Sequence, residues 1–223
     1  MSYKIVVMSC DKNEDLWYPF YHCMEKYWKD HPEIIYSTET KVNPYYKTIC
    51  VNTPISCWTY RVYQTISKLN CDNILLMVDD IFIRDYVNGE HINYIENMIN
   101  FNIASFNFER SFDSGDKPLF QHEDMLIRND NGKFKLSLMC QLWKKKAMLR
   151  LFLDTLDPWT FEKNNNALDY KYLISKNGDI IKWGRTKDSW KFGVIKGKWA
   201  RECKEFFDKE GIDIDYSIRG FFD

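Results

Sequence analysis

The sequence predicts an α/β fold with a mostly parallel, doubly wound sheet and helices on both faces. Short apolar runs alternate with amphipathic helical stretches along most of the chain, an order typical of parallel sheets. The run Asn73–Val78 (NILLMV) is apolar at nearly every position, as in a strand buried on both faces of such a sheet. The length of 223 residues suits a single domain.

The first part of the chain is predicted to run β-α-β and then α-β. Asp15 is a good N-cap for a helix through Trp28, because its carboxylate can accept from the first helical turn. Ser56 is expected to cap a second helix that ends near Lys68. Spacings of three and four residues predict the buried faces of these two helices, Leu16, Phe20, Cys23 and Tyr27 on the first and Trp58, Val62, Ile66 and Leu69 on the second. Strands are predicted at 4–9, 34–38 and 73–78, with a shorter β-prone stretch at 48–51.

The second part continues the alternation around a polar segment, 109–132, that has little periodicity. Helices are expected after Asn88, over 144–153, from Glu162 to about 175 and before Gly211. Strands are expected at 103–108, 135–140 and 179–183, and 212–218 alternates like an edge strand.

Charge and cysteine content exclude several classes of protein. The formal net charge is -1, which gives no general attraction to nucleic acid and predicts at most peripheral membrane contact. The seven cysteines form no C-x-x-C pair, so neither a zinc site nor a disulfide framework is expected. Without a signal peptide or an apolar run near ~18 residues, the chain is predicted to be cytoplasmic.

An acidic pair, Asp79-Asp80, follows the central apolar run directly. In open parallel sheets, ligands bind beyond the carboxyl ends of the strands. Two adjacent carboxylates there repel each other unless a cation offsets them, and Mg²⁺ or Mn²⁺ commonly binds such groups together with substrate phosphates. The pair therefore indicates a diphosphate ligand, and the alternative is a helix cap beside a solvated turn acid.

Other phosphate-binding and hydrolase motifs are absent from the sequence. No G-x-G-x-x-G follows the first strand, and there is no G-x-x-x-x-G-K-[ST] or G-x-S-x-G. These absences argue against a Rossmann dinucleotide site, a Walker-type NTPase and an α/β-hydrolase.

Four stretches of the chain together resemble bacterial and viral polysaccharide glycosyltransferases of the GT-A fold. They are VVMSCDKNEDLW at 6–17, SCWTYRV at 56–62, LLMVDDIFI at 75–83, and SLMCQLWKKK followed by PWTFE at 137–162. The resemblance implies a single glycosyltransferase domain over 1–223, with a nucleotide-binding half at about 1–110 and an acceptor-side half at about 111–223. It also implies a hexosyltransferase-like enzyme of polysaccharide biosynthesis. Its donor would be a nucleotide diphosphate sugar and its acceptor a saccharide or a lipid-linked molecule.

The resemblance also assigns roles to individual residues. Ser9, Cys10 and Asp11 would contact the donor nucleoside, and Arg61 would approach the donor; the alternative for Arg61 is an exposed helix arginine. Asp79 and Asp80 would bind Mn²⁺ or Mg²⁺, although they are contiguous where the family pattern is D-x-D.

Glu162 would be the general base of an inverting enzyme, at the start of a helix where a carboxylate is favoured. Asp124 and Asp169 are the rivals for that role, Glu162 as a simple helix-end charge is the alternative, and a retaining mechanism needs no such base.

The segment 182–199 is basic and rich in tryptophan. It suits a phosphate-facing lid, a surface loop anchored by its rings, or single-stranded nucleic acid, and the near-neutral net charge weighs against the last. Two other functions stay open for the whole chain. One is a non-catalytic relative that binds a nucleotide or glycan. The other is a nucleotidyltransferase, which normally has a basic, glycine-rich loop after the first strand where this chain is acidic.

Overall fold

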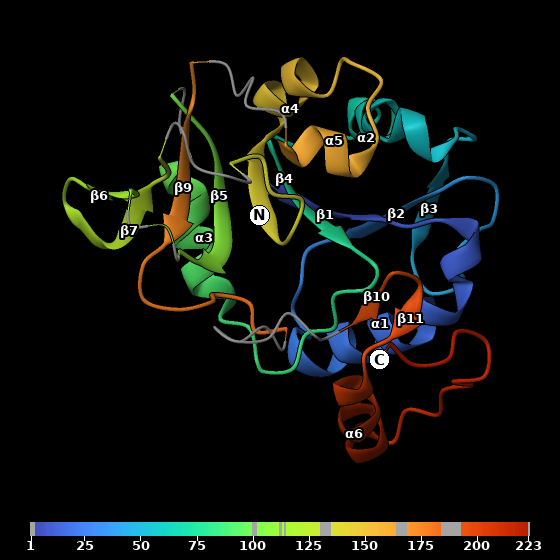
Figure 1. The fold of residues 1–223 in the computed structure, drawn as a ribbon. Coiled ribbons are helices and arrows are strands. Elements are labelled where there is room, and N and C mark those ends of the chain that lie inside the picture. Colours follow the sequence, from blue (N-terminus) through green and yellow to red (C-terminus); the bar gives the residue numbers. More distant parts are fainter. Residues whose placement is uncertain are drawn as a thin grey trace.

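A mixed β-sheet separates two apolar layers in the computed structural model (Figure 1), which describes residues 3–99, 102–111, 113, 115–129, 135–163, 169–183 and 193–222. The sheet that these residues form has nine strands in the order β3-β2-β1-β4-β8-β5-β9-β7-β6. The strands are β1 Tyr3–Met8, β2 Ile34–Thr38, β3 Lys47–Cys50, β4 Asn73–Val78, β5 Ile103–Arg110, β6 Lys117–Leu119, β7 His122–Ile127, β8 Gln141–Lys144 and β9 Lys171–Ser175.

The sheet is mostly parallel, as the sequence predicts. Strands β3, β2, β1 and β4 run parallel to one another, and β5 runs parallel to β9. Strand β8 lies antiparallel between β4 and β5, so β5 has the same direction as β4. The carboxyl ends of β1, β2 and β4 therefore meet at one edge of the sheet, where ligands bind in folds of this kind.

Helices cover both faces of the sheet (Figure 1). They are α1 Glu14–Tyr27, α2 Trp58–Ser67, α3 Gly89–Met98, α4 Lys145–Leu151, α5 Pro158–Lys163 and α6 Arg201–Glu210, with 3-10 turns η1 Asp11–Asn13 and η2 Ile55–Cys57. A separate hairpin pairs β10 Val194–Ile195 with β11 Lys198–Trp199. No helix in the described parts of the chain is long and apolar enough to cross a bilayer.

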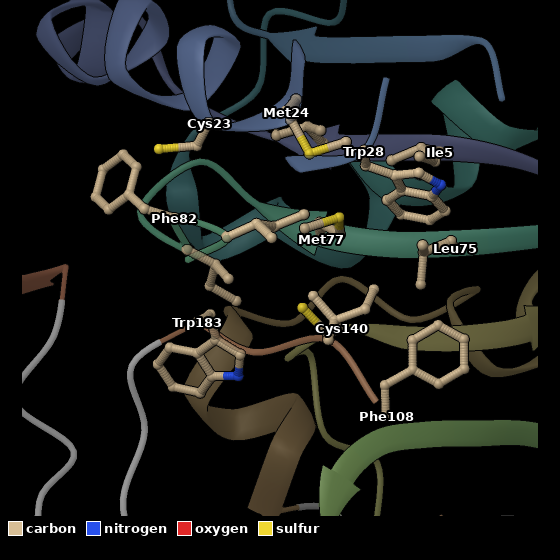
Figure 2. Packing of buried hydrophobic residues seen from close by; sticks show 14 of the residues in the cluster. Ile5, Cys23, Met24, Trp28, Leu75, Met77, Phe82, Phe108, Cys140 and Trp183 are labelled. Carbon is tan, nitrogen blue, oxygen red and sulfur yellow. The ribbon is translucent and has the colours of Figure 1, made fainter. Parts of the chain in front are cut away.

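Alternate residues of β4 supply the two apolar layers. Leu75 and Met77 pack with residues of α1, α3 and α6, and Figure 2 shows them near Met24 of α1 and Trp28, which follows that helix. Ile74 and Leu76 pack on the opposite face with residues of α2, α4 and α5. Because side chains of a strand alternate between faces, the continuous apolar run is what a strand between two helical layers requires.

The predicted helix faces are confirmed, but both predicted N-caps are wrong. Leu16, Phe20, Cys23 and Tyr27 are buried on α1, and Trp58, Val62, Ile66 and Leu69 are buried on or just after α2. Helix α1 begins at Glu14, so Asp15 lies inside its first turn and its carboxylate pairs with Arg219. Ser56 lies within η2 and contacts the Cys57 thiol, and α2 begins at Trp58.

Three predicted strands in the second half are wrong, and so is one long helix. Residues 135–140 are buried in turns, because the backbone N–H of Leu138 bonds to Glu162 and Cys140 has a positive φ of 40°. In place of the helix predicted from Glu162 to about 175, the structure has the end of the short α5 and then β9, which pairs with β5 and β7. Residues 179–183 form bends, and in 212–218 the Asp215 carboxylate accepts from Ser217 N–H within turns instead of an edge strand.

Candidate functional site

The acidic pair lies at the carboxyl end of β4, between β1 and β8 near the middle of the sheet. Asp79 follows Val78 directly and is 3% exposed, whereas Asp80 is only partly buried. The two neighbouring residues therefore have different surroundings, and Asp80 is the less buried of the two.

Hydrogen bonds hold both oxygens of the Asp79 carboxylate. Ser9 Oγ donates to Oδ2 at 2.5 Å, and Asn13 Nδ2 donates to Oδ1 at 3.1 Å. Trp17 Nε1 donates to Ser9 Oγ at 2.8 Å. Ser9 follows β1 and Asn13 precedes α1, so the strand-to-helix loop beside β4 provides these donors.

Burial and mutual repulsion act against ionisation of the pair. Burial, followed by the charge of Asp80, raises the pKa of Asp79 to about 8, although Ser9, Asn13 and Arg219 offset part of the effect. Burial also raises the pKa of Asp80 to about 6, against the opposing influence of its own backbone N–H and of Arg219. Two carboxylates in this state ionise together at neutral pH only when a cation is placed near them.

The donor set suits a divalent cation that shares its coordination with a ligand. In the described part of the chain, no three His, Cys, Asp or Glu side chains gather as a complete metal site. Mg²⁺ and Mn²⁺ need no such cluster, because they bind one or two carboxylates together with substrate phosphates. Asp80 has no side-chain partner among the described residues and would provide the direct ligand. Each oxygen of Asp79 already accepts one hydrogen bond, so Asp79 would contribute negative charge next to the ion rather than the direct ligand.

The three residues predicted to contact a nucleoside lie together after β1, but two of them have structural partners. Ser9 is buried against Asp79. Asp11 accepts from Thr40 N–H and Oγ1 and from Lys41 N–H, so these bonds outweigh partial burial and lower its pKa to about 2. Cys10 lies between them, partly exposed, and burial with the charges of Asp79 and Glu39 raises the pKa of its thiol to about 11. Cys10 is therefore a neutral surface of the site rather than a nucleophile.

Arg61 is buried, not exposed on its helix. It is 2% exposed on α2, and its Nη1 donates to Glu39 Oε1 at 2.5 Å. The other oxygen of Glu39 accepts from Asp11 N–H at 2.5 Å. Glu39 follows β2, so the ion pair ties the loop after β2 to α2, and the bond from Asp11 ties it to the loop after β1. The Nε of Arg61 has no hydrogen-bond partner among the described residues.

Glu162 lies near the carboxyl end of α5, not at the start of a helix as predicted. Its Oε1 accepts from Leu138 N–H at 2.9 Å, and burial raises its pKa despite that bond. Helix α5 packs on the face of the sheet that α2 covers (Figure 1). Among the described residues, no hydrogen bond joins Glu162 to Asp79 or Asp80.

The two rival bases lie in less suitable places. Asp124 is on β7, and three strands separate β7 from β4 in the sheet, a span of about 19 Å at ordinary strand spacing. Asp169 precedes β9 and lines a cavity of about 360 Å³ with Arg150 and Tyr170, at the amino end of β9. Neither carboxylate is placed to reach the edge where β4 ends.

Two described residues of the basic stretch 182–199, Lys182 and Gly193, lie against the acidic pair or the loop that follows it. The carbonyl of Lys182 accepts from Arg84 N–H at 2.8 Å. A Cβ at Gly193 would lie 2.2 Å from the carbonyl oxygen of Asp80, so the backbone of Gly193 rests directly on that peptide. Arg185, Lys187, Trp190, Lys191 and Phe192 lie outside the described residues.

Four residues of the site escape prediction from sequence: Asn13, Trp17, Glu39 and Arg219. Trp17 lies within a stretch that carries the family resemblance, and Glu39 follows a predicted strand, so weak signals existed for both. Arg219 lies in the C-terminal segment, where no pattern marks it.

Comparison with known proteins supports the fold. No protein-family model and no curated protein matches the chain. Among solved structures, it resembles S. aureus TarS at 10% identity over 79% of this chain and 35% of that one, with a TM-score of 0.51. It also resembles the bifunctional IspDF from Campylobacter jejuni, at 11% identity over 86% of this chain and 54% of that one, with a TM-score of 0.48.

A third similar structure is a cytidylyltransferase from Leptospira borgpetersenii, at 10% identity over 98% of this chain and 97% of that one, with a TM-score of 0.47. The chain thus spans about half of the IspDF chain and about a third of the TarS chain. Identities this low show the fold alone, and the TarS match is the one of these three above 0.5. The chain therefore has the mostly parallel α/β fold, with helices on both faces of the sheet, that it shares with TarS.

Proposed function

We propose that this protein is a metal-assisted glycosyltransferase that takes a sugar from a nucleotide diphosphate sugar. The observation that carries the proposal is the pair of carboxyl groups at the end of β4, whose pKa values burial raises to about 8 and about 6. Desolvated carboxylates cost folding free energy, and a site that keeps them indicates a cationic ligand. One structure of TarS is a complex with UDP, which agrees with a nucleotide as the ligand.

The residues of the site divide the work in the proposed reaction. Asp80 would hold a Mn²⁺ or Mg²⁺ ion, and Ser9 and Asn13 orient Asp79 beside that place. Such an ion would supply positive charge to offset the charge of a leaving diphosphate. The loop of Cys10 and Asp11 borders the place of the nucleoside.

Glu162 is the proposed base for the acceptor hydroxyl, if the enzyme inverts the anomeric centre. Its raised pKa suits a group that must accept a proton near neutral pH. The acceptor is a saccharide or a lipid-linked molecule.

A nucleotidyltransferase is the second candidate, because cytidylyltransferases are among the similar structures. Such an enzyme binds a nucleoside triphosphate, and the loop after β1 offers it little positive charge. That loop contains Lys12 but no glycine, and its Asp11 is already committed to Thr40 and Lys41.

The decisive experiment is calorimetry of nucleoside diphosphates, nucleotide sugars and CTP, each with and without Mn²⁺, followed by a turnover assay with the ligands that bind. We expect Mn²⁺-dependent binding of a nucleoside diphosphate, and donor hydrolysis or transfer. Asp80→Asn should abolish Mn²⁺-dependent binding without lowering the melting temperature.

Asp85→Asn is the matched control, because Asp85 is in the same loop but pairs with exposed Lys182. Tight binding of CTP with release of pyrophosphate would favour the second candidate. Binding without turnover of any donor would favour a non-catalytic relative.

A further inference from the structure

Arg219 brings the C-terminal segment to the acidic pair. Its guanidinium donates to both oxygens of Asp15, at 2.6 Å each, and to the carbonyl of Lys12 at 3.2 Å. Its Nη2 also donates to Asn13 Oδ1 at 2.9 Å. The side chains of Arg219 and Asp15 are 9% and 15% exposed, so this is a largely buried, two-pronged ion pair.

The chemistry of arginine determines which way the Asn13 amide faces. A guanidinium has donors and no acceptor, so only the oxygen of the Asn13 amide can face Arg219. The amide nitrogen is then turned to the other side, where it donates to Asp79 Oδ1 at 3.1 Å. A reversed amide would place donor against donor at Arg219 and acceptor against acceptor at an ionised Asp79.

A second obligate donor acts in the same way on the other oxygen of Asp79. The indole N–H of Trp17 can only donate, so Ser9 Oγ must accept it. The Ser9 hydroxyl hydrogen is then directed to Asp79 Oδ2 at 2.5 Å, since its alternative acceptor, the Cys10 carbonyl, is 3.4 Å away. Two relays thus converge on one carboxylate, from Trp17 through Ser9 and from Arg219 through Asn13.

We propose that Arg219 is a positioning residue of the Asp79-Asp80 site, which acts by fixing the orientation of the Asn13 amide. No motif in the sequence identifies Arg219 as part of the site. Its side chain makes no hydrogen bond to Asp79 or Asp80 and bonds instead to Lys12, Asn13 and Asp15. Its consequence for catalysis rests on the proposed function; the orientation of Asn13 does not. The competing explanation is that Arg219 only docks the C-terminal segment onto α1.

The test uses three variants: Arg219→Gln, Asn13→Ala, and the double variant that combines these two changes. Each is compared with the control variant Lys26→Gln. Lys26 is the matched control, because its ion pair with Glu210 also ties C-terminal residues to α1 but has no link to Asp79. The first readout needs no ligand and is the side-chain amide signal of Asn13 in ¹⁵N-labelled protein, assigned by its loss in Asn13→Ala. We expect that signal to be protected from exchange in the wild type and in Lys26→Gln, and to become that of a free amide in Arg219→Gln.

The second readout is the affinity for the Mn²⁺ complexes of UDP and GDP by calorimetry. Residues that orient metal ligands typically affect affinity by about 10- to 100-fold, and we expect a loss in that range for Arg219→Gln and none for Lys26→Gln. In the Asn13→Ala background, Arg219→Gln should cause no further loss.

An unchanged Asn13 signal in Arg219→Gln, or losses that add in the double variant, would overturn the proposal. If the wild type binds neither complex, the proposed function fails, and the amide signal still decides whether Arg219 orients Asn13.

Discussion

Replacing Gly193 by alanine probes the contact between the C-terminal part of the chain and Asp80. Gly193 has a φ of +93°, and an added Cβ would lie 2.2 Å from the Asp80 carbonyl oxygen. Its own N–H donates to the Cys203 thiol at 2.9 Å, and its carbonyl accepts from Ala200 N–H at 3.0 Å. The glycine is therefore held on both sides and cannot easily move away from Asp80.

Two costs add in the Gly193→Ala variant. A left-handed backbone costs a residue with a Cβ about 1–2 kcal/mol. Forcing an extra carbon into a filled space costs about 1–3 kcal/mol more, because the Asp80 peptide or its neighbours must shift. The free energy of unfolding should fall by roughly 2–5 kcal/mol in total.

Gly197→Ala separates the two costs. Gly197 has a similar φ of +82° and no atom within 4 Å of an added Cβ, so only the backbone cost applies there. For a domain of this size, the extra contact cost should lower the melting temperature of Gly193→Ala by about 2–12 °C relative to Gly197→Ala. Gly193→Ala should also weaken Mn²⁺-dependent nucleotide binding, and Gly197→Ala should not. Equal melting temperatures and equal binding would refute the view that this segment rests on Asp80.

Three further predictions concern the groups around the acidic pair. The pKa of Asp79 is about 8 in the native state against an ordinary value of 3.8, so the native state binds this proton more tightly than the unfolded state does. The free energy of unfolding of the metal-free protein, measured in urea, should therefore fall as pH rises from about 4 to about 8. Asp79→Asn should flatten that profile. Arg61→Met removes the charged partner of Glu39 and should lower the free energy of unfolding by about 1.5–3 kcal/mol, measured in urea; no change would mean that the pair contributes nothing. Trp17→Phe keeps an apolar ring but loses the donor to Ser9, so the free energy of unfolding in urea should fall by about 1 kcal/mol; an unchanged value would show that this bond adds no stability.

The central elements of the fold were accessible from the sequence because local burial decides them. Strand β4 has the predicted bounds, Asn73–Val78, since a strand between two helical layers must be apolar on both faces. The first helix buries the face predicted from the spacing of Leu16, Phe20, Cys23 and Tyr27. In both cases, the periodicity of one short stretch contains the information.

The second half was harder because periodicity does not reveal where a backbone N–H finds its partner. Residues 135–140 are buried as in a strand, yet the N–H of Leu138 is satisfied by a side chain, that of Glu162. Residues 171–175 belong to a strand because β5 and β7 are available on either side. Such partners lie far away in the chain, and a local pattern contains no trace of them.

The candidate site shows the same limit. The position of Asp79 and Asp80 follows from the strand that precedes them, so it was predictable. Arg219 is 204 residues from its partner Asp15, and Gly193 reaches Asp80 only because the chain returns to the end of β4. These contacts depend on the complete fold rather than on any local pattern.

The contiguity of the two acids explains how they can have different roles. Neighbouring residues at the end of a strand tend to face opposite sides of the sheet, and Asp79 continues the side of Leu75 and Met77, which pack on α1. That direction takes its carboxylate to Ser9, Asn13 and the first turn of α1, where donors occupy both oxygens. Asp80 is thereby directed away from those donors and remains partly exposed, without a side-chain partner among the described residues. Asp79 is consequently held in place by the protein, and Asp80 is left to bind a ligand. Two contiguous acids can therefore divide these roles without the intervening residue of a D-x-D motif.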